Sequence, residues 1–248
     1  MKLTSKISCW KNVVLSNHLV YLVPFVTIIG IFISKPWEQE NLYQLSCQVY
    51  SWEYITLGPL VALILLLFCC LERVVQENTL IFLGSRGRMF RRLLWINGVC
   101  SCAISGYLNL IVLIMGKIFY DSKFSENEIM KIYDVNIFQL SIRTFFSMSL
   151  LLNILGIFFM ITQIYFGKTS CGIICILIVV TGEAAGKFYI GKQLFWEYAF
   201  PIDTVLHLSQ KMFRKDTIYL ILLSFVLSCV LFFVVETRDY LVRKKEGL

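Results

Sequence analysis

Long runs without a charged residue recur along the chain and predict its architecture. Five of them reach the roughly 18–20 residues that a helix needs to cross about 30 Å of hydrocarbon. Runs of this length are too long for barrel strands, and only helices or closed barrels satisfy backbone polar groups in lipid. The expected spans are residues 18–34, 54–71, 93–116, 144–166, 170–190 and 217–235.

The fifth of these spans is shorter than the others. Its charge-free part ends before Glu183, and Lys187 follows one helical turn later. Residues four apart lie on one face of a helix, so these two side chains can pair within the membrane and let the helix continue to about residue 190. The small residues around Glu183 also permit a break, so a continuous span and a partly re-entrant one both stay open.

Composition supports a membrane protein. Hydrophobic residues make up 58% of the 248 residues and charged residues only 16%, and the mean hydropathy is +0.73. Soluble domains average about 45–50% apolar and about 25% charged residues. Together with the spans, this predicts a single all-α membrane domain of six transmembrane helices.

Basic residues predict that both termini lie in the cytosol. Lys and Arg are denser in the segments that this N-in/C-in orientation places inside, as the positive-inside rule requires. The two sharpest clusters are Arg86, Arg88, Arg91 and Arg92 before the third span, and Arg243, Lys244 and Lys245 after the sixth. A net charge of +7 placed in this way suits anionic lipid headgroups, so we expect no nucleic-acid partner.

The N-terminal segment, residues 1–17, has a helical pattern of its own. Leu3, Ile7, Trp10 and Val14 fall at spacings of four, three and four and therefore share one helix face. An apolar face with a tryptophan, opposite lysines, is typical of a helix lying in the membrane interface. The alternative is an ordinary polar lead-in to the first span.

Residues 72–92, between the second and third spans, combine charged ends with an apolar turn. The turn consists of Leu80, Ile81, Phe82 and Leu83, and a basic amphipathic run follows it. An apolar turn in a cytosolic loop needs a partner, either the membrane surface or another protein. A plain positive-inside anchor would explain the arginines but not this turn.

In this loop the chain resembles the permeases of type-2 ATP-binding-cassette exporters. The shared features are a Glu-Arg start, a Glu-x-Thr-Leu motif and a Ser-Arg pair ahead of a basic segment. In that family the loop forms a cytosolic coupling helix that docks into the ATPase subunit. The docking residues that the resemblance implies are Glu77, Thr79, Leu80, Phe82, Leu83, Ser85, Arg86 and Arg88. Asn78 and the Arg86-Gly87 pair depart from the family pattern.

The resemblance also implies partners and a setting. These are ATPase subunits that bind ATP and Mg, a second copy of the permease or a paralogue, membrane lipids, and a peptide or lipid-like cargo. The family's short single-permease members serve immunity to antimicrobial peptides such as lantibiotics and bacitracin, in the bacterial plasma membrane. By the same layout, the outer segment, residues 191–216, would be re-entrant, and the alternative is an aromatic belt on a surface loop.

The chain lacks the residue patterns of catalysis. His18 and His207 stand apart from each other and from any acidic cluster, so neither a histidine-based hydrolase nor a metal site has its parts. No Gly-rich phosphate loop occurs, so ATP would be bound and hydrolysed only by a partner. We therefore expect no catalytic residue, metal or cofactor in this chain. The remaining alternatives are a scaffold or sensor that recruits a cytosolic partner through residues 72–92, and a membrane enzyme.

Overall fold

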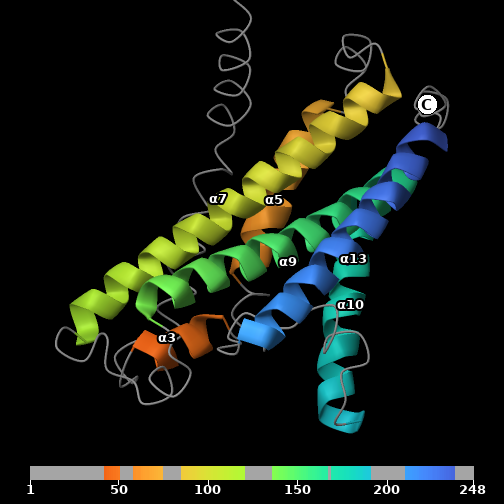
Figure 1. Ribbon diagram of the computed structural model, residues 1–248. Helices are drawn as coiled ribbons and strands as arrows, with labels where there is room; N and C mark the ends of the chain where they lie inside the picture. The colour runs from red at the N-terminus through yellow and green to blue at the C-terminus, as the bar shows by residue number, and fades with distance from the viewer. Residues whose placement is uncertain are drawn as a thin grey trace, which may run out of the picture.

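The computed structural model describes residues 42–50, 58–74, 85–120, 136–166, 169–190 and 210–237. All regular elements in these ranges are α-helices (Figure 1). They are α3 (Leu42–Val49), α5 (Pro59–Val74), α7 (Arg86–Tyr120), α9 (Ile137–Phe166), α10 (Thr169–Ile190) and α13 (Gln210–Thr237). The expected interfacial helix and the first span lie outside the described residues.

Among the described residues, three helical stretches are long and apolar enough to cross a membrane. They are Arg86–Phe119, Ile137–Phe166 and Phe213–Thr237. Shorter apolar stretches, Pro59–Phe68 and Ser170–Val179, lie in α5 and α10. The all-α class is therefore confirmed for the described part, and its long apolar helices are those of a membrane protein. The count of six spans and the N-in/C-in orientation stay predictions.

The long helices α7, α9 and α13 run side by side, with α7 antiparallel to the other two (Figure 1). At one end, Arg86 at the start of α7 contacts Glu236 at the end of α13. At the other end, the guanidinium of Arg143 near the start of α9 lies 5.6 Å from the ring centroid of Phe213 near the start of α13. α9 is the central helix, because it also packs against α5 and α10.

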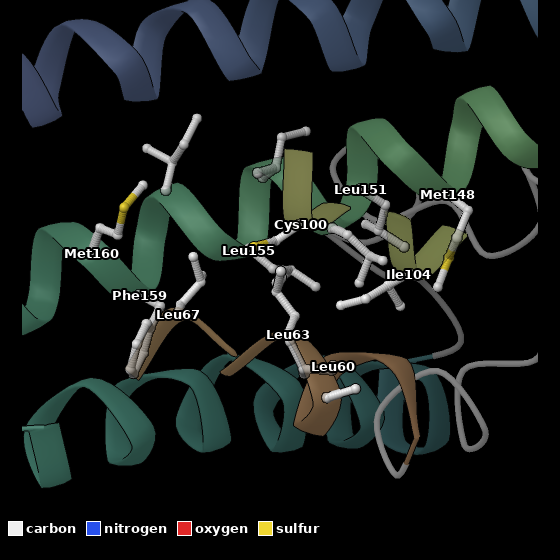
Figure 2. Close-up of a cluster of buried hydrophobic side chains, with 14 of the residues drawn as sticks. Leu60, Leu63, Leu67, Cys100, Ile104, Met148, Leu151, Leu155, Phe159 and Met160 are labelled. Atoms are coloured by element: carbon white, nitrogen blue, oxygen red, sulfur yellow. The ribbon is translucent and has the colours of Figure 1, made fainter. Parts of the chain in front are cut away.

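The apolar core lies where α5, α7 and α9 meet (Figure 2). Leu63 and Leu67 reach from α5 toward Leu155 and Phe159 of α9, and Ile104 joins them from α7. In its most apolar window α9 is 67% buried, whereas α13 is only 17% buried. The exposed apolar side chains of α13 therefore face the surroundings, as lipid-contacting side chains would.

The short helix α3 contributes apolar side chains to the core. Leu45, Val49 and Tyr50 are buried at its end, and the helix packs against α7. Burial raises the pKa of the Tyr50 phenol well above its ordinary value, because a charged phenolate would lose its hydration. Tyr50 therefore stays protonated and uncharged at neutral pH.

Helix α7 is longer than its apolar run. Its 35 residues rise about 52 Å, against about 30 Å of hydrocarbon. The basic residues ahead of the third span thus belong to the same helix as the span. α5, in contrast, begins only at Pro59, whose fixed φ and missing N–H suit the first position of a helix. The first helical bond there runs from the N–H of Ala62 to the carbonyl of Gly58, at 3.0 Å.

Helix α10 runs without a break from Thr169 to Ile190. The backbone of the fifth predicted span is therefore one continuous helix, although the sequence also allowed a break. Glu183 and Lys187 both lie on it, but their side chains are outside the description. The outer segment before the sixth span is partly helical, because α13 already begins at Gln210. Residues 191–209 lie outside the described residues.

Helix α9 starts with a reciprocal cap ahead of its apolar run. The N–H of Gln139 donates to the Asn136 Oδ1 at 2.8 Å, and the N–H of Asn136 faces the Gln139 Oε1 at 3.4 Å. This arrangement satisfies two N–H groups that the first turn leaves without a helical partner. The helix therefore begins at Ile137, seven residues before the charge-free run that predicted the span.

Replacing Asn136 with alanine should destabilise the protein by about 1 kcal/mol, because the Gln139 N–H loses its acceptor. Asn136→Gly should cost only a few tenths of a kcal/mol, since glycine also suits this position. Melting temperatures of the purified variants in one detergent test the order. Equal losses for alanine and glycine would contradict a capping role.

Candidate functional site

The described part of the expected docking segment forms the base of α7. The hydroxyl of Ser85 accepts from the backbone N–H of Arg88 at 3.3 Å, so Ser85 caps the helix. The Arg88 side chain folds back onto the same hydroxyl, with Nε at 3.3 Å. Arg86 donates from a terminal guanidinium nitrogen to the backbone carbonyl of Glu236. All three residues thus have contacts within their own chain.

The other predicted site residues lie outside the description. Residues 75–84 are among the undescribed ones, so the structure says nothing of the remaining docking residues. These are Glu77, Thr79, Leu80, Phe82 and Leu83. The same holds for Leu3, Ile7, Trp10 and Val14 of the interfacial helix. Their roles stay predictions.

Positive charge collects at the end of α7 where a helix favours negative charge. Arg86, Arg88, Arg91 and Arg92 lie in its first seven residues, and the first turn holds no acidic residue. The N-terminal end of a helix carries a partial positive charge, so these cations are unfavourable there by themselves. Anionic surroundings, such as lipid headgroups or an acidic protein surface, would offset this cost.

A second polar feature, which the sequence analysis missed, runs along one face of α7. Asn97, Ser101, Ser105 and Asn109 follow one another at steps of four residues, and all four are at most 9% exposed. A step of four keeps side chains on nearly the same face of a helix. The signal was present in the sequence, as an uncharged polar stripe inside an otherwise apolar span.

The residues of α9 that face this stripe also follow one another at steps of four, in the opposite chain direction. The Ser105 hydroxyl donates to the backbone carbonyl of Phe145 at 2.9 Å. The Asn109 amide donates to the backbone carbonyl of Ser141 at 2.7 Å, and the Ser141 hydroxyl returns a bond of 3.1 Å to the Asn109 Oδ1. We call this set of contacts, from Asn97–Asn153 to Asn109–Ser141, the polar seam.

One step of the polar seam has no hydrogen bond. By the regular spacing, Ser101 of α7 is matched with Ser149 of α9. Both hydroxyl oxygens are buried and have no hydrogen-bond partner among the described residues. The polar seam thus offers an internal comparison between a bonded and an unbonded serine on one helix face.

Three helices meet at the end of the polar seam nearest the middle of α9. The Asn97 amide donates to both the backbone carbonyl and the side-chain Oδ1 of Asn153, at 2.8 and 2.7 Å. The Asn153 amide in turn donates to the Ser224 hydroxyl of α13 at 2.8 Å. Gly156 of α9 leaves room for Asn97, because a Cβ there would overlap its side chain. We call these residues the three-helix junction.

The chemistry of these groups favours helix association rather than catalysis. In the described part, the buried polar residues are serines, threonines and asparagines, none of which titrates near neutral pH. In lipid, helices gain little from the hydrophobic effect and associate through close packing and interhelical hydrogen bonds. The polar seam and the three-helix junction therefore set how α7, α9 and α13 align.

Ser105→Ala should lower stability by about 0.6–1.7 kcal/mol, the range of interhelical hydrogen bonds in membranes. Ser101→Ala, one turn away on the same face, should be neutral or slightly stabilising, because it removes a buried hydroxyl that makes no bond. The melting temperatures of both variants, compared in the same detergent, provide the measurement. A larger loss for Ser101→Ala than for Ser105→Ala would contradict the assigned pattern.

Among the described residues, no group of three or more His, Cys, Asp or Glu side chains is placed to hold a metal ion. Among the cysteines whose side chains the structure describes, Cys100, Cys102, Cys171, Cys175 and Cys229 are free thiols.

Comparisons with known proteins give no relative. No family model matches the chain, and no curated protein or solved structure matches it. Its function must therefore be argued from its own residues.

Proposed function

We propose that the chain is the membrane-spanning subunit of an ATP-binding-cassette exporter, driven by a separate ATPase. The observation that carries the proposal is the apolar turn Leu80–Leu83 within residues 72–92, set between charged segments. A membrane anchor has no need of such a turn, whereas a docking helix that enters a cleft of a partner does. ATP and Mg would bind to the ATPase and not to this chain.

Features at the start of α7 favour a docking segment that lies at the membrane surface. Because α7 continues without a break from Arg86 to Tyr120, a push on the preceding loop would act directly on a long transmembrane helix. The clustered arginines fit anionic surroundings at that surface. A second copy of the chain, or a paralogue, would complete the transporter.

The cargo we propose is an amphipathic peptide, as in immunity to lantibiotics or bacitracin, or a lipid-like molecule. Buried side chains in the described spans are apolar or uncharged polar. Such walls suit a molecule with apolar and hydrogen-bonding groups better than a small ion, which needs charged or closely spaced oxygen ligands. The setting we propose is a bacterial plasma membrane.

The test is to co-express the tagged chain with the ATPase encoded beside it and to measure capture. We expect the wild-type chain to capture the ATPase and Glu77→Lys to reduce capture at least tenfold. Arg88→Glu should reduce it as well. Lys117→Glu is the matched control, because Lys117 is an exposed cation at the opposite end of α7 and should leave capture unchanged.

Two results would contradict the proposal. One is that the folded wild-type chain captures no ATPase. The other is that Glu77→Lys captures it as well as the wild type does. Capture of a cytosolic protein without a nucleotide-binding motif would instead support the alternative, a scaffold or sensor that recruits its partner through residues 72–92.

A further inference from the structure

The C-terminal end of α13 contacts a cation of another helix. The last turn of α13 contains no basic residue, although the final carbonyls of a helix lack helical partners and favour a cation. The guanidinium of Arg86, at the first position of α7, donates to one of these carbonyls, that of Glu236. Two residues 150 positions apart in sequence thus join the start of α7 to the end of α13.

A second contact lies one turn along both helices. The rings of Phe90 and Phe232 meet edge to face, with centroids 5.1 Å apart and an interplanar angle of 75°. This geometry is a favourable one for aromatic pairs. Steps of four on each helix, from Arg86 to Phe90 and from Glu236 to Phe232, keep the two contacts on one pair of facing sides. We call these two contacts the α7–α13 clasp.

The clasp stands directly beside the proposed docking segment. Ser85 caps α7, and Arg86 is the first helical residue after it. A displacement of residues 72–84 therefore reaches the clasp before any other part of α7. Further along, the three-helix junction ties α7 to α9 and α13. α7 and α13 are consequently joined at two levels, and a displacement at the base of α7 has a short path to α13.

We propose that Arg86 is a positioning residue, which passes movement of the docking segment to α13, and not a contact of the ATPase. The inference rests on the proposed function, and it reassigns one of the docking residues implied by the resemblance. One terminal nitrogen of its guanidinium donates to the Glu236 carbonyl, within the chain itself. The docking face is left to the other docking residues that the resemblance implies.

The test follows ATPase capture and helix movement separately, in the full complex in lipid nanodiscs. Spin labels at Ile178→Cys on α10 and Ile218→Cys on α13 report the distance between these helices, since both positions are exposed. The other cysteines are replaced by serine or alanine. Distances are measured without nucleotide and with ATP plus vanadate. We expect the distance to change on trapping in the otherwise wild-type chain.

Arg86→Ala should leave ATPase capture within twofold of the wild type and reduce the distance change to less than half. Arg86→Lys should retain more of the change, because an ammonium still reaches a carbonyl. The matched control is Arg91→Ala, whose side chain bonds Gly87 of its own helix; it should leave the distance change intact. Melting temperatures confirm that each variant is folded.

Distinct outcomes would overturn the inference. A tenfold loss of capture in Arg86→Ala would make Arg86 a docking contact. A full-size distance change in Arg86→Ala would make the clasp purely structural. An unchanged distance in the otherwise wild-type chain would show that α13 does not move relative to α10 on trapping. If the wild-type chain captures no ATPase, the proposed function fails, and this role of Arg86 fails with it.

Discussion

Gly156→Ala is expected to destabilise the protein by about 1–3 kcal/mol, the usual cost of overfilling a packed core. A Cβ at this position would overlap the Asn97 Oδ1 and lie 2.8 Å from its Cγ, and it would come within 3.0 Å of a methyl group of Leu67. α5, α7 and α9 converge there, so no single side chain can move away freely. Asn97 would have to leave its hydrogen bonds to Asn153.

Melting temperature in detergent measures this effect, and two variants serve as controls. Gly98→Ala adds the same methyl group one residue from Asn97, where nothing lies within 4 Å, and should not destabilise. Asn97→Ala combined with Gly156→Ala removes the clashing group, so the pair should melt above Gly156→Ala alone. A wild-type melting temperature for Gly156→Ala would show that α7 and α9 are not this close.

Asn153→Leu is expected to cost about 1–3 kcal/mol, because the buried Asn97 amide loses one of its two acceptors and the half-buried Ser224 hydroxyl loses its donor. The leucine side chain is of similar size but can neither accept from the Asn97 amide nor donate to the Ser224 hydroxyl. The loss should appear in the melting temperature and in the susceptibility of the connections to proteolysis.

A double-mutant cycle with Ser224→Ala separates this bond from general packing. The combined variant should lose less than the sum of the single variants, since both remove the same hydrogen bond. Ser228→Ala is the control on α13, because its hydroxyl bonds only the Ser224 carbonyl of its own helix. Strict additivity of Asn153→Leu and Ser224→Ala would rule out the assigned bond.

The all-helical class was predictable from the sequence because long charge-free runs have few physical alternatives in lipid. The starts of the helices were less so. The fourth span was expected to start at residue 144, directly after Arg143, yet α9 already begins six residues before Arg143. The Phe213 ring accommodates this guanidinium, and the cap at Asn136 offers a better start. The cap at Asn136 therefore marks the start of α9 better than the charged residue Arg143 does.

The polar seam could be found only in part from the sequence. The stripe on α7 is regular, but a search for ionisable groups passes over asparagine and serine. Its partners are harder still to find, because three of the acceptors are the backbone carbonyls of Ser141, Phe145 and Asn153, which no side-chain pattern reveals. Pairing of α7 with α9 also depends on Gly156, whose role is visible only when the helices are placed together.

For the docking residues, the sequence suggested the positions but not their separate roles. Sequence motifs suggested Ser85, Arg86 and Arg88 as a group, but a motif does not distinguish a residue that contacts a partner from one that shapes the segment. In the structure, Ser85 and Arg88 form the cap of α7 and Arg86 bonds α13. Contacts within the chain were needed to separate these roles.

The matched steps of four along the polar seam restrict how this chain can change in length. One residue inserted between Asn97 and Asn109 would turn the rest of α7 by about 100°. Asn109 would then point away from Ser141, and its amide would lack a partner in the membrane. Insertions and deletions in related genes should therefore fall in the connections, such as residues 121–135, and spare both faces of the polar seam.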